Sequence, residues 1–175
     1  QMCIRARFPP AAPSAPSPIP DSVRPALAQT YRLEENRAGL LPAILGCMED
    51  WYTKGSEKAA FRVGDNTLSL LWTEGGVEYC IPVGFENALE YELDLGGNRF
   101  AVGVTGRFTA NEDDEPVLKV TLCFLESSSS RLLKFVFRPD GGLPVKFDEA
   151  PGLLVAMRSL QGTMKSQSQG LDLFK

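Results

Sequence analysis

The chain has 175 residues, of which 43% are apolar and 23% charged, and its formal net charge is −4. These values are typical of one globular domain with at most a small appendage. The acidic balance disfavours a nucleic-acid-binding surface, which needs a basic patch. No apolar run approaches the ~20 residues of a membrane-spanning helix, so we expect neither nucleic acid nor membrane as a partner.

Residues 1–29 form a Pro-rich segment that holds more than half of the chain's 13 prolines. Because proline fixes φ and lacks an N–H donor, we expect an extended, semi-rigid linker there. A binding site for a proline-reading module is the alternative. The segment begins with Gln1 and has no apolar signal-peptide core, so we expect a piece of a longer chain without a secretory signal.

The four cysteines are widely scattered, and no pair has the C-x-x-C spacing of zinc or redox sites. We therefore expect isolated, reduced thiols and a cytoplasmic location, because disulfide frameworks belong to smaller secreted chains.

The linker is followed by a short predicted strand, Thr30–Asn36, and by a predicted helix near residues 40–53. Apolar residues recur at helical spacing between Leu40 and Tyr52, which defines one apolar face. Pro42 is compatible with a helix only in its first turn, so the helix should begin near Leu40.

From Lys58 to Asp148 apolar and polar residues alternate in eight runs, separated mainly by short turns rich in Gly, Asn and Asp. The runs cover residues 59–63, 68–72, 77–85, 89–95, 100–108, 117–124, 133–137 and 143–147. Short connections make neighbouring strands antiparallel, which predicts a mainly β, eight-stranded up-and-down meander or barrel. A final helix is predicted near 151–161. The domain would then span 30–162, and 163–175 would be a flexible tail.

No motif in the chain supplies a chemistry. The absence of histidine removes Ser-His-Asp and Cys-His catalysis, and no glycine-rich phosphate loop occurs. The acidic stretch Asn111–Glu115 lacks the glycine and distal glutamate of a calcium-binding EF-hand, so a solvated loop is expected. We therefore expect no catalytic residue, no cofactor and no metal.

The inward positions of the predicted strands are rich in aromatic rings. These rings either fill the interior or line a cavity for a small apolar ligand. The candidate cavity-lining residues are Trp72, Tyr79, Phe85, Tyr91, Phe100 and Phe135.

Several short strings carry a resemblance to a known family: YRLEEN with a following GL, PVGF, FTANEDDEPVLKVTLCF and LLKFVF. Over roughly Tyr31 to Leu160 the chain resembles the C-terminal lipocalin-like β-domain of bacterial serine hydrolases of the β-lactamase/penicillin-binding-protein superfamily. The resemblance implies an N-terminal serine hydrolase domain in the parent chain. It also implies that this chain is a non-catalytic accessory domain that packs against or assembles that catalytic domain.

The catalytic Ser-x-x-Lys, Tyr-x-Asn and Lys-Thr-Gly elements of that superfamily match no position here, so no catalytic residue is carried over. By this interpretation the chain alone is not an enzyme. The alternative is a stand-alone lipocalin-like binding module for a small apolar ligand.

Overall fold

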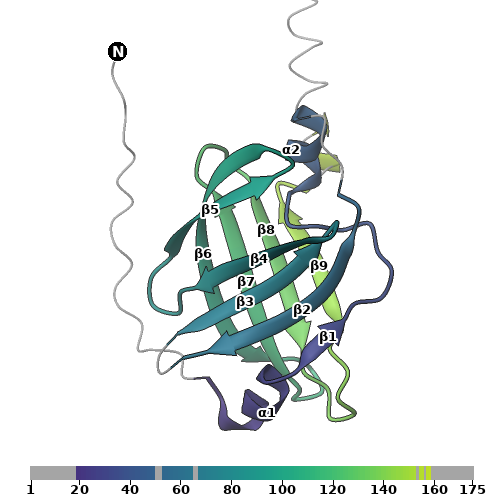
Figure 1. The fold of residues 1–175 in the computed structure, drawn as a ribbon, viewed down its shortest axis with the longest axis vertical. Helices are drawn as coiled ribbons and strands as arrows, with labels where there is room; N and C mark the ends of the chain where they lie inside the picture. The colour runs from purple at the N-terminus through teal and green to yellow at the C-terminus, as the bar shows by residue number, and fades with distance from the viewer. Residues whose placement is uncertain (1–18, 50–52, 65–66, 153, 156, 159–175) are drawn as a thin grey trace, which may run out of the picture.

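The computed structural model describes residues 19–49, 53–64, 67–152, 154–155 and 157–158, and these form nine strands and three short helices (Figure 1). The helices are η1 (Asp21–Val23), α1 (Arg24–Leu27) and α2 (Ala43–Met48). The strands are β1 (Thr30–Arg32), β2 (Ser56–Val63), β3 (Leu68–Glu74), β4 (Val77–Val83), β5 (Leu89–Leu95), β6 (Asn98–Ala110), β7 (Pro116–Phe124), β8 (Ser130–Val136) and β9 (Val145–Ala150).

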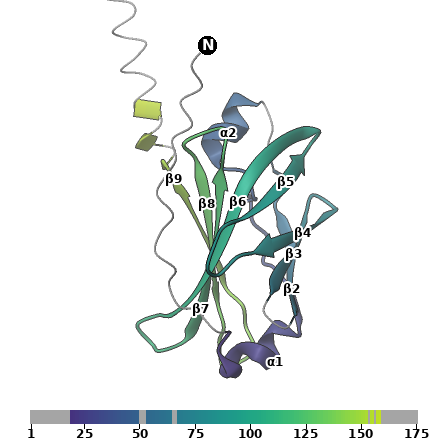
Figure 2. The ribbon, with the colours of Figure 1, turned by 90° about the vertical axis from the view of Figure 1, so that its left-hand side faces the viewer.

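The strands form two antiparallel sheets, with the order β1-β2-β3-β4 in the first and β5-β6-β7-β8-β9 in the second. Within each sheet every strand pairs with its neighbour in the chain, which confirms the predicted antiparallel meander between the short turns. The strands of the first sheet cross in front of the second in Figure 1, and Figure 2 shows the two layers from the side.

Of the two predicted forms, a meander or a barrel, the structure does not have the closed barrel, because the meander breaks between β4 and β5. The sheets touch there through one parallel bridge, in which Gly84 N donates to Val104 O at 3.3 Å and Gly106 N donates to Gly84 O at 2.7 Å. A Cβ on Gly106 would overlap the side chain of Val83, so glycine permits this close approach. On the opposite side β1 and β9 are the outer strands of their sheets, and the barrel stays open.

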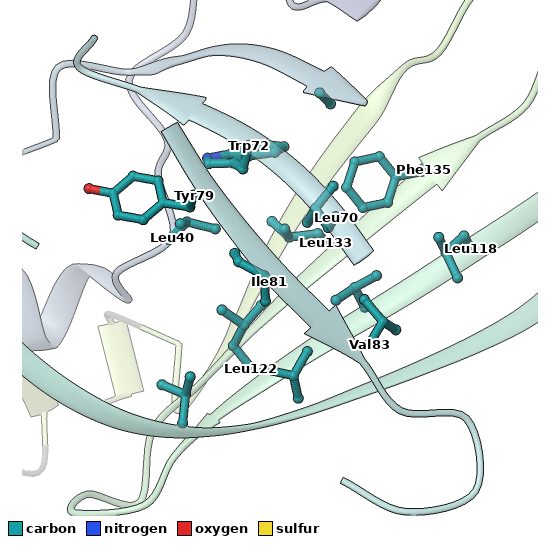
Figure 3. Close-up of a cluster of buried hydrophobic side chains, with 14 of the residues drawn as sticks. Leu40, Leu70, Trp72, Tyr79, Ile81, Val83, Leu118, Leu122, Leu133 and Phe135 are labelled. Carbon is teal, nitrogen blue, oxygen red and sulfur yellow. The ribbon is translucent and has the colours of Figure 1, made fainter. Parts of the chain in front are cut away.

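The core lies between the sheets and follows the predicted two-residue period (Figure 3). Alternate residues of β3 and β7 are almost fully buried, whereas the intervening residues are intermediate or exposed in most cases. Val77 and Leu89 are the first residues of β4 and β5. Their side chains are 52% and 41% exposed, although the alternation predicts that both point into the core. The alternation therefore predicts correctly which face of each strand is buried, but it also assigns exposed residues at strand ends to that buried face.

Both helical regions lie at the ends of this core. In Figure 1 α2 covers one end and α1 the other, and both contribute buried leucines. The structure has α2 from Ala43 to Met48, shorter than the predicted helix, with Pro42 as its N-cap. The predicted first strand is likewise confined to Thr30–Arg32. Trp51 and Tyr52, assigned to the helix face, lie outside the described residues.

Residues 21–27, which the sequence analysis placed in the linker, form η1 and α1 and bury Val23 and Leu27 in the core. Pro25 lies in the first turn of α1, where its missing N–H has no helical partner to lose. Residues 154–155 and 157–158 have helical backbone. Residues 151–152, where the predicted C-terminal helix begins, are described but not helical. The remaining residues of that helix, the tail and residues 1–18 of the linker lie outside the described residues.

Candidate functional site

The interior is filled around two of the six candidate cavity residues. Trp72 and Phe135 are 1% and 0% exposed, and their rings meet edge to face at 6.2 Å. Phe61 contacts Phe135 in the same way, with ring centroids 5.2 Å apart. Such contacts are the favoured arrangement of aromatic pairs in a close-packed core. Figure 3 shows Trp72 and Phe135 between the strands.

The other four candidates do not join one pocket. Phe85 stacks on Phe108 at 5.9 Å, whereas Phe100 meets Phe124 edge to face at 5.6 Å. Burial raises the pKa of both Tyr79 and Tyr91, and the negative charges of Glu74 and Asp94 raise that of Tyr79 further. The structure therefore distributes the six residues between the core centre and separate positions at its margin.

A buried group of charged residues, which the sequence analysis did not single out, lies at the α2 end of the core. We call Glu74, Arg131 and Glu149 the charged cluster. Glu74 is 3% exposed, and its carboxylate accepts hydrogen bonds from Leu40 N at 2.8 Å and from Trp72 Nε1 at 3.3 Å. The hydroxyl of Thr53 also donates to this carboxylate.

Arg131 connects the second sheet to the same segment. Its guanidinium lies 3.2 Å from Glu149 and donates to the carbonyl of Leu41. Glu149 in turn accepts from the backbone N–H of Ala43, at the start of α2, at 2.8 Å. Burial lowers the pKa of Arg131, and the nearby Glu149 and Glu74 oppose that shift.

The charged cluster therefore holds the segment before α2 to both sheets. Its polar atoms are mostly occupied by backbone groups and by one another, although the buried Arg131 Nε has no partner among the described atoms. Glu74 lies two and four positions after Trp72 and Leu70 on β3, so it belongs to the same inward face. Arg131 lies four positions before Phe135 on β8 and likewise belongs to the inward face. A charged residue at an inward position was thus the sequence signal that could have revealed the cluster.

A surface groove follows the open side between β1 and β9, which we call the seam. It has a volume of about 460 Å³ and is lined by residues 32–36 on one wall and by Arg138, residues 142–145 and Phe147 on the other. A second hollow of about 540 Å³ adjoins the first wall and extends to residues 54–58. The two hollows share Arg32, Leu33, Glu35 and Asn36.

Asn36 fixes the wall that these two hollows share. Its amide nitrogen donates to Glu34 O at 2.7 Å and to Ser56 O at 3.0 Å, and its side-chain oxygen accepts from Ser56 N at 3.2 Å. The Asn36 side chain therefore makes the backbone hydrogen bonds to Ser56 that a paired strand would make, just beyond the end of β1. The seam has one wall tied to β2, together with apolar and charged side chains of both signs.

A smaller hollow of about 180 Å³ lies between α2 and the second sheet. Its apolar walls come from Leu45, Met48, Phe100 and Phe124, and Glu49 and Glu126 lie at the same hollow. Phe100 is the only one of the six candidate residues among the lining residues of these three hollows.

The remaining polar candidates are surface features. Residues 112–114 of the acidic loop are exposed, and Asn111 Oδ1 accepts from the backbone N–H of Glu115 at 2.8 Å, as a self-contained turn does. Cys47, Cys80 and Cys123 are free and exposed, while Cys3 lies outside the described residues. Among the described side chains, no three acidic or thiol groups are close enough together to ligate a metal ion.

Comparisons of the chain with protein-family models, curated proteins and solved structures give no match. In the part of the chain that the structure describes, no helix has both the length and the apolar character to span a bilayer.

Proposed function

We propose that the chain is a non-catalytic accessory β-domain of a β-lactamase-like serine hydrolase, and that it packs against the catalytic domain of the parent chain. The supporting observation is the filled interior, in which Trp72 and Phe135 occupy the space that a ligand would need in a hollow barrel. With a packed interior, the outer grooves and edges are the surfaces available for binding.

The seam is the surface that suits a protein partner best. Its walls follow β1 and β9, and the outer strand of a sheet presents backbone N–H and C=O groups that can pair with another chain. Leu143 and Phe147 add apolar area, while Arg32 and Arg138 can meet acidic groups. We propose that the catalytic domain covers this seam.

Two observations test the proposal. The coding sequence upstream of Gln1 should contain Ser-x-x-Lys, and the purified chain alone should not hydrolyse β-lactam, ester or peptide substrates, because no nucleophile has a histidine base. An upstream region without a hydrolase domain would contradict the accessory role. Turnover abolished by a single Ser or Cys substitution would show that the chain is itself an enzyme.

The second candidate function is a stand-alone binding module for a small apolar ligand, and the hollow beside α2 favours it. Its volume and its walls of Leu45, Met48, Phe100 and Phe124 suit a small hydrophobic group. A fluorescent hydrophobic dye should then bind the native protein, and Phe100→Gln should weaken binding about tenfold, since burying an unpaired amide costs free energy. Equal dye binding by wild type and variant would exclude this hollow.

A further inference from the structure

Four cationic side chains form a row across the outer face of the second sheet. Arg107 on β6 is directly opposite Lys119 on β7, which is opposite Lys134 on β8, which is opposite Lys146 on β9. We call these four residues the basic row. With neighbouring strands about 4.8 Å apart, three such steps span about 14 Å.

The basic row is largely unneutralised within the described part of the chain. Lys134 lies 3.4 Å from Asp148, whereas Arg107, Lys119 and Lys146 form no ion pair with a described residue. Like charges directly opposite each other on a sheet are destabilising. A concentration of positive charge on a chain of net charge −4 therefore indicates a surface suited to an acidic partner.

The same sheet carries an acidic row of matching length. Glu90, Glu92 and Asp94 are exposed on β5 and alternate with its inward side chains. Residues two apart on a strand are about 6.8 Å apart, so these three carboxylates also span about 14 Å. Glu92 lies 3.5 Å from Arg99, but both side chains are about 70% exposed, and such pairs contribute little stability.

We propose that the basic row of one copy binds the acidic row of a second copy in a symmetric dimer. The basic row runs across β6 to β9 and the acidic row runs along β5, and the sheet bends between them, so that β5 lies on the side of the first sheet (Figure 2). In the proposed dimer a two-fold axis relates the copies, so that the basic row of each faces the acidic row of the other. Each contact then occurs twice, as in an isologous dimer.

The side chains around the basic row favour a protein partner over a nucleic acid. Outward neighbours on the adjoining positions include Thr105, Thr121 and Leu132, and no aromatic ring lies among them. Binding of single strands relies on aromatic rings on which the bases stack. The small and aliphatic side chains instead suit close contact between two sheets.

Sedimentation velocity at two salt concentrations tests the dimer. At about 10 mM salt, where charges interact over ~30 Å, we expect a dimer, and at about 1 M, where this range is ~3 Å, a monomer. Arg107→Glu/Lys146→Glu should weaken association at least about tenfold, because both contacts acquire like charges. Both residues are exposed, and circular dichroism verifies the fold.

The matched control is Lys58→Glu/Arg62→Glu. It makes the same change of charge at exposed positions on the outer face of the first sheet, and should alter dimer affinity less than about twofold. If the charge-reversed protein unfolds, Arg107→Gln/Lys146→Gln serves in its place and should still weaken the dimer more than the control. An equal loss in the control would overturn the proposal.

A charge exchange provides the sharpest test. Glu90→Lys/Glu92→Lys should lose self-association, but mixed with Arg107→Glu/Lys146→Glu it should form a heterodimer, because both contacts regain opposite charges. A wild-type protein that stays monomeric at low salt, or a mixture that stays monomeric, would overturn the proposal. So would a monomer that binds phosphatidylserine vesicles or single-stranded DNA through the basic row.

Discussion

Phe135 lies at the centre of the packed interior, with its ring against Trp72 and Phe61 and with no exposed area. Phe135→Ala should lower the free energy of unfolding by about 3–5 kcal/mol, as large-to-small core substitutions do. Denaturant unfolding measures this change. The control, Lys134→Ala, removes a side chain that is 33% exposed and paired with Asp148, and should cost less than about 1 kcal/mol. A larger loss at Lys134 than at Phe135 would mean that the faces of β8 are reversed.

Arg131 tests whether the charged cluster stabilises the fold. Arg131→Met leaves Glu149 and Glu74 without their cation, and removing one partner of a buried pair costs about 3–5 kcal/mol. Arg99→Met is the matched control, since Arg99 also pairs with a glutamate of the second sheet but at an exposed position, where the loss should be below about 1 kcal/mol. Equal losses in denaturant unfolding would show that burial adds nothing to this pair.

Tyr79 gives the fold a dependence on alkaline pH. Burial raises the pKa of its phenol above the ordinary value near 10, so the folded state holds this proton more tightly than the unfolded state. Its contribution to stability is complete below about pH 10 and is lost as the pH rises through the folded-state pKa. The free energy of unfolding should therefore fall more steeply above about pH 10 in wild type than in Tyr79→Phe. Parallel pH profiles of the two proteins would contradict this.

The segment before α2 is the element that joins both sheets, and Gly39 permits its close approach. A Cβ at Gly39 would overlap the Glu74 carboxylate and the Thr53 hydroxyl. Gly39→Ala should therefore displace Glu74 and lower the thermal midpoint, with a cost of about 1–3 kcal/mol. Gly152→Ala, where a Cβ meets nothing within 4 Å, should stay within about 0.5 kcal/mol. Similar melting of the two variants would show that this segment adapts readily.

The strands were predictable from sequence because their side chains alternate between a buried and an exposed face. That alternation locates β2 to β9, but it holds equally for one closed sheet and for two open ones. The break near Gly84 depends on the close approach of Val83 and Gly84 to Gly106, which no local pattern reveals. α2 is shorter than predicted, since apolar spacing continues past the residues with helical backbone.

The candidate site was predictable only in part. The ring-bearing positions of the interior follow from periodicity, but whether rings fill or line a space depends on how the two sheets pack. The charged cluster was missed because Glu74 and Arg131 lie just outside the predicted runs 68–72 and 133–137, whereas the structure extends β3 to Glu74 and begins β8 at Ser130. The seam depends on the distance between β1 and β9, which are far apart in the chain.

For the molecule as a whole, the interior acts as a packed support and the binding surfaces lie outside it. The seam and the basic row share β9, where Lys146 lies between the seam residues Val145 and Phe147, but its side chain belongs to the opposite face of the strand. Loss of the proposed hydrolase contact by mutation at the seam should therefore leave the proposed dimer contact intact.

Hydrogen exchange in the full parent protein tests the accessory role most directly. We expect backbone amides of residues 32–36 and of Leu143, Val145 and Phe147, which line the seam, to exchange more slowly in the proposed parent protein than in this chain alone, because a catalytic domain packed on the seam would cover them. Amides of the buried strand β7 serve as the reference and should exchange equally in both. Equal exchange at the seam in the two proteins would contradict the account.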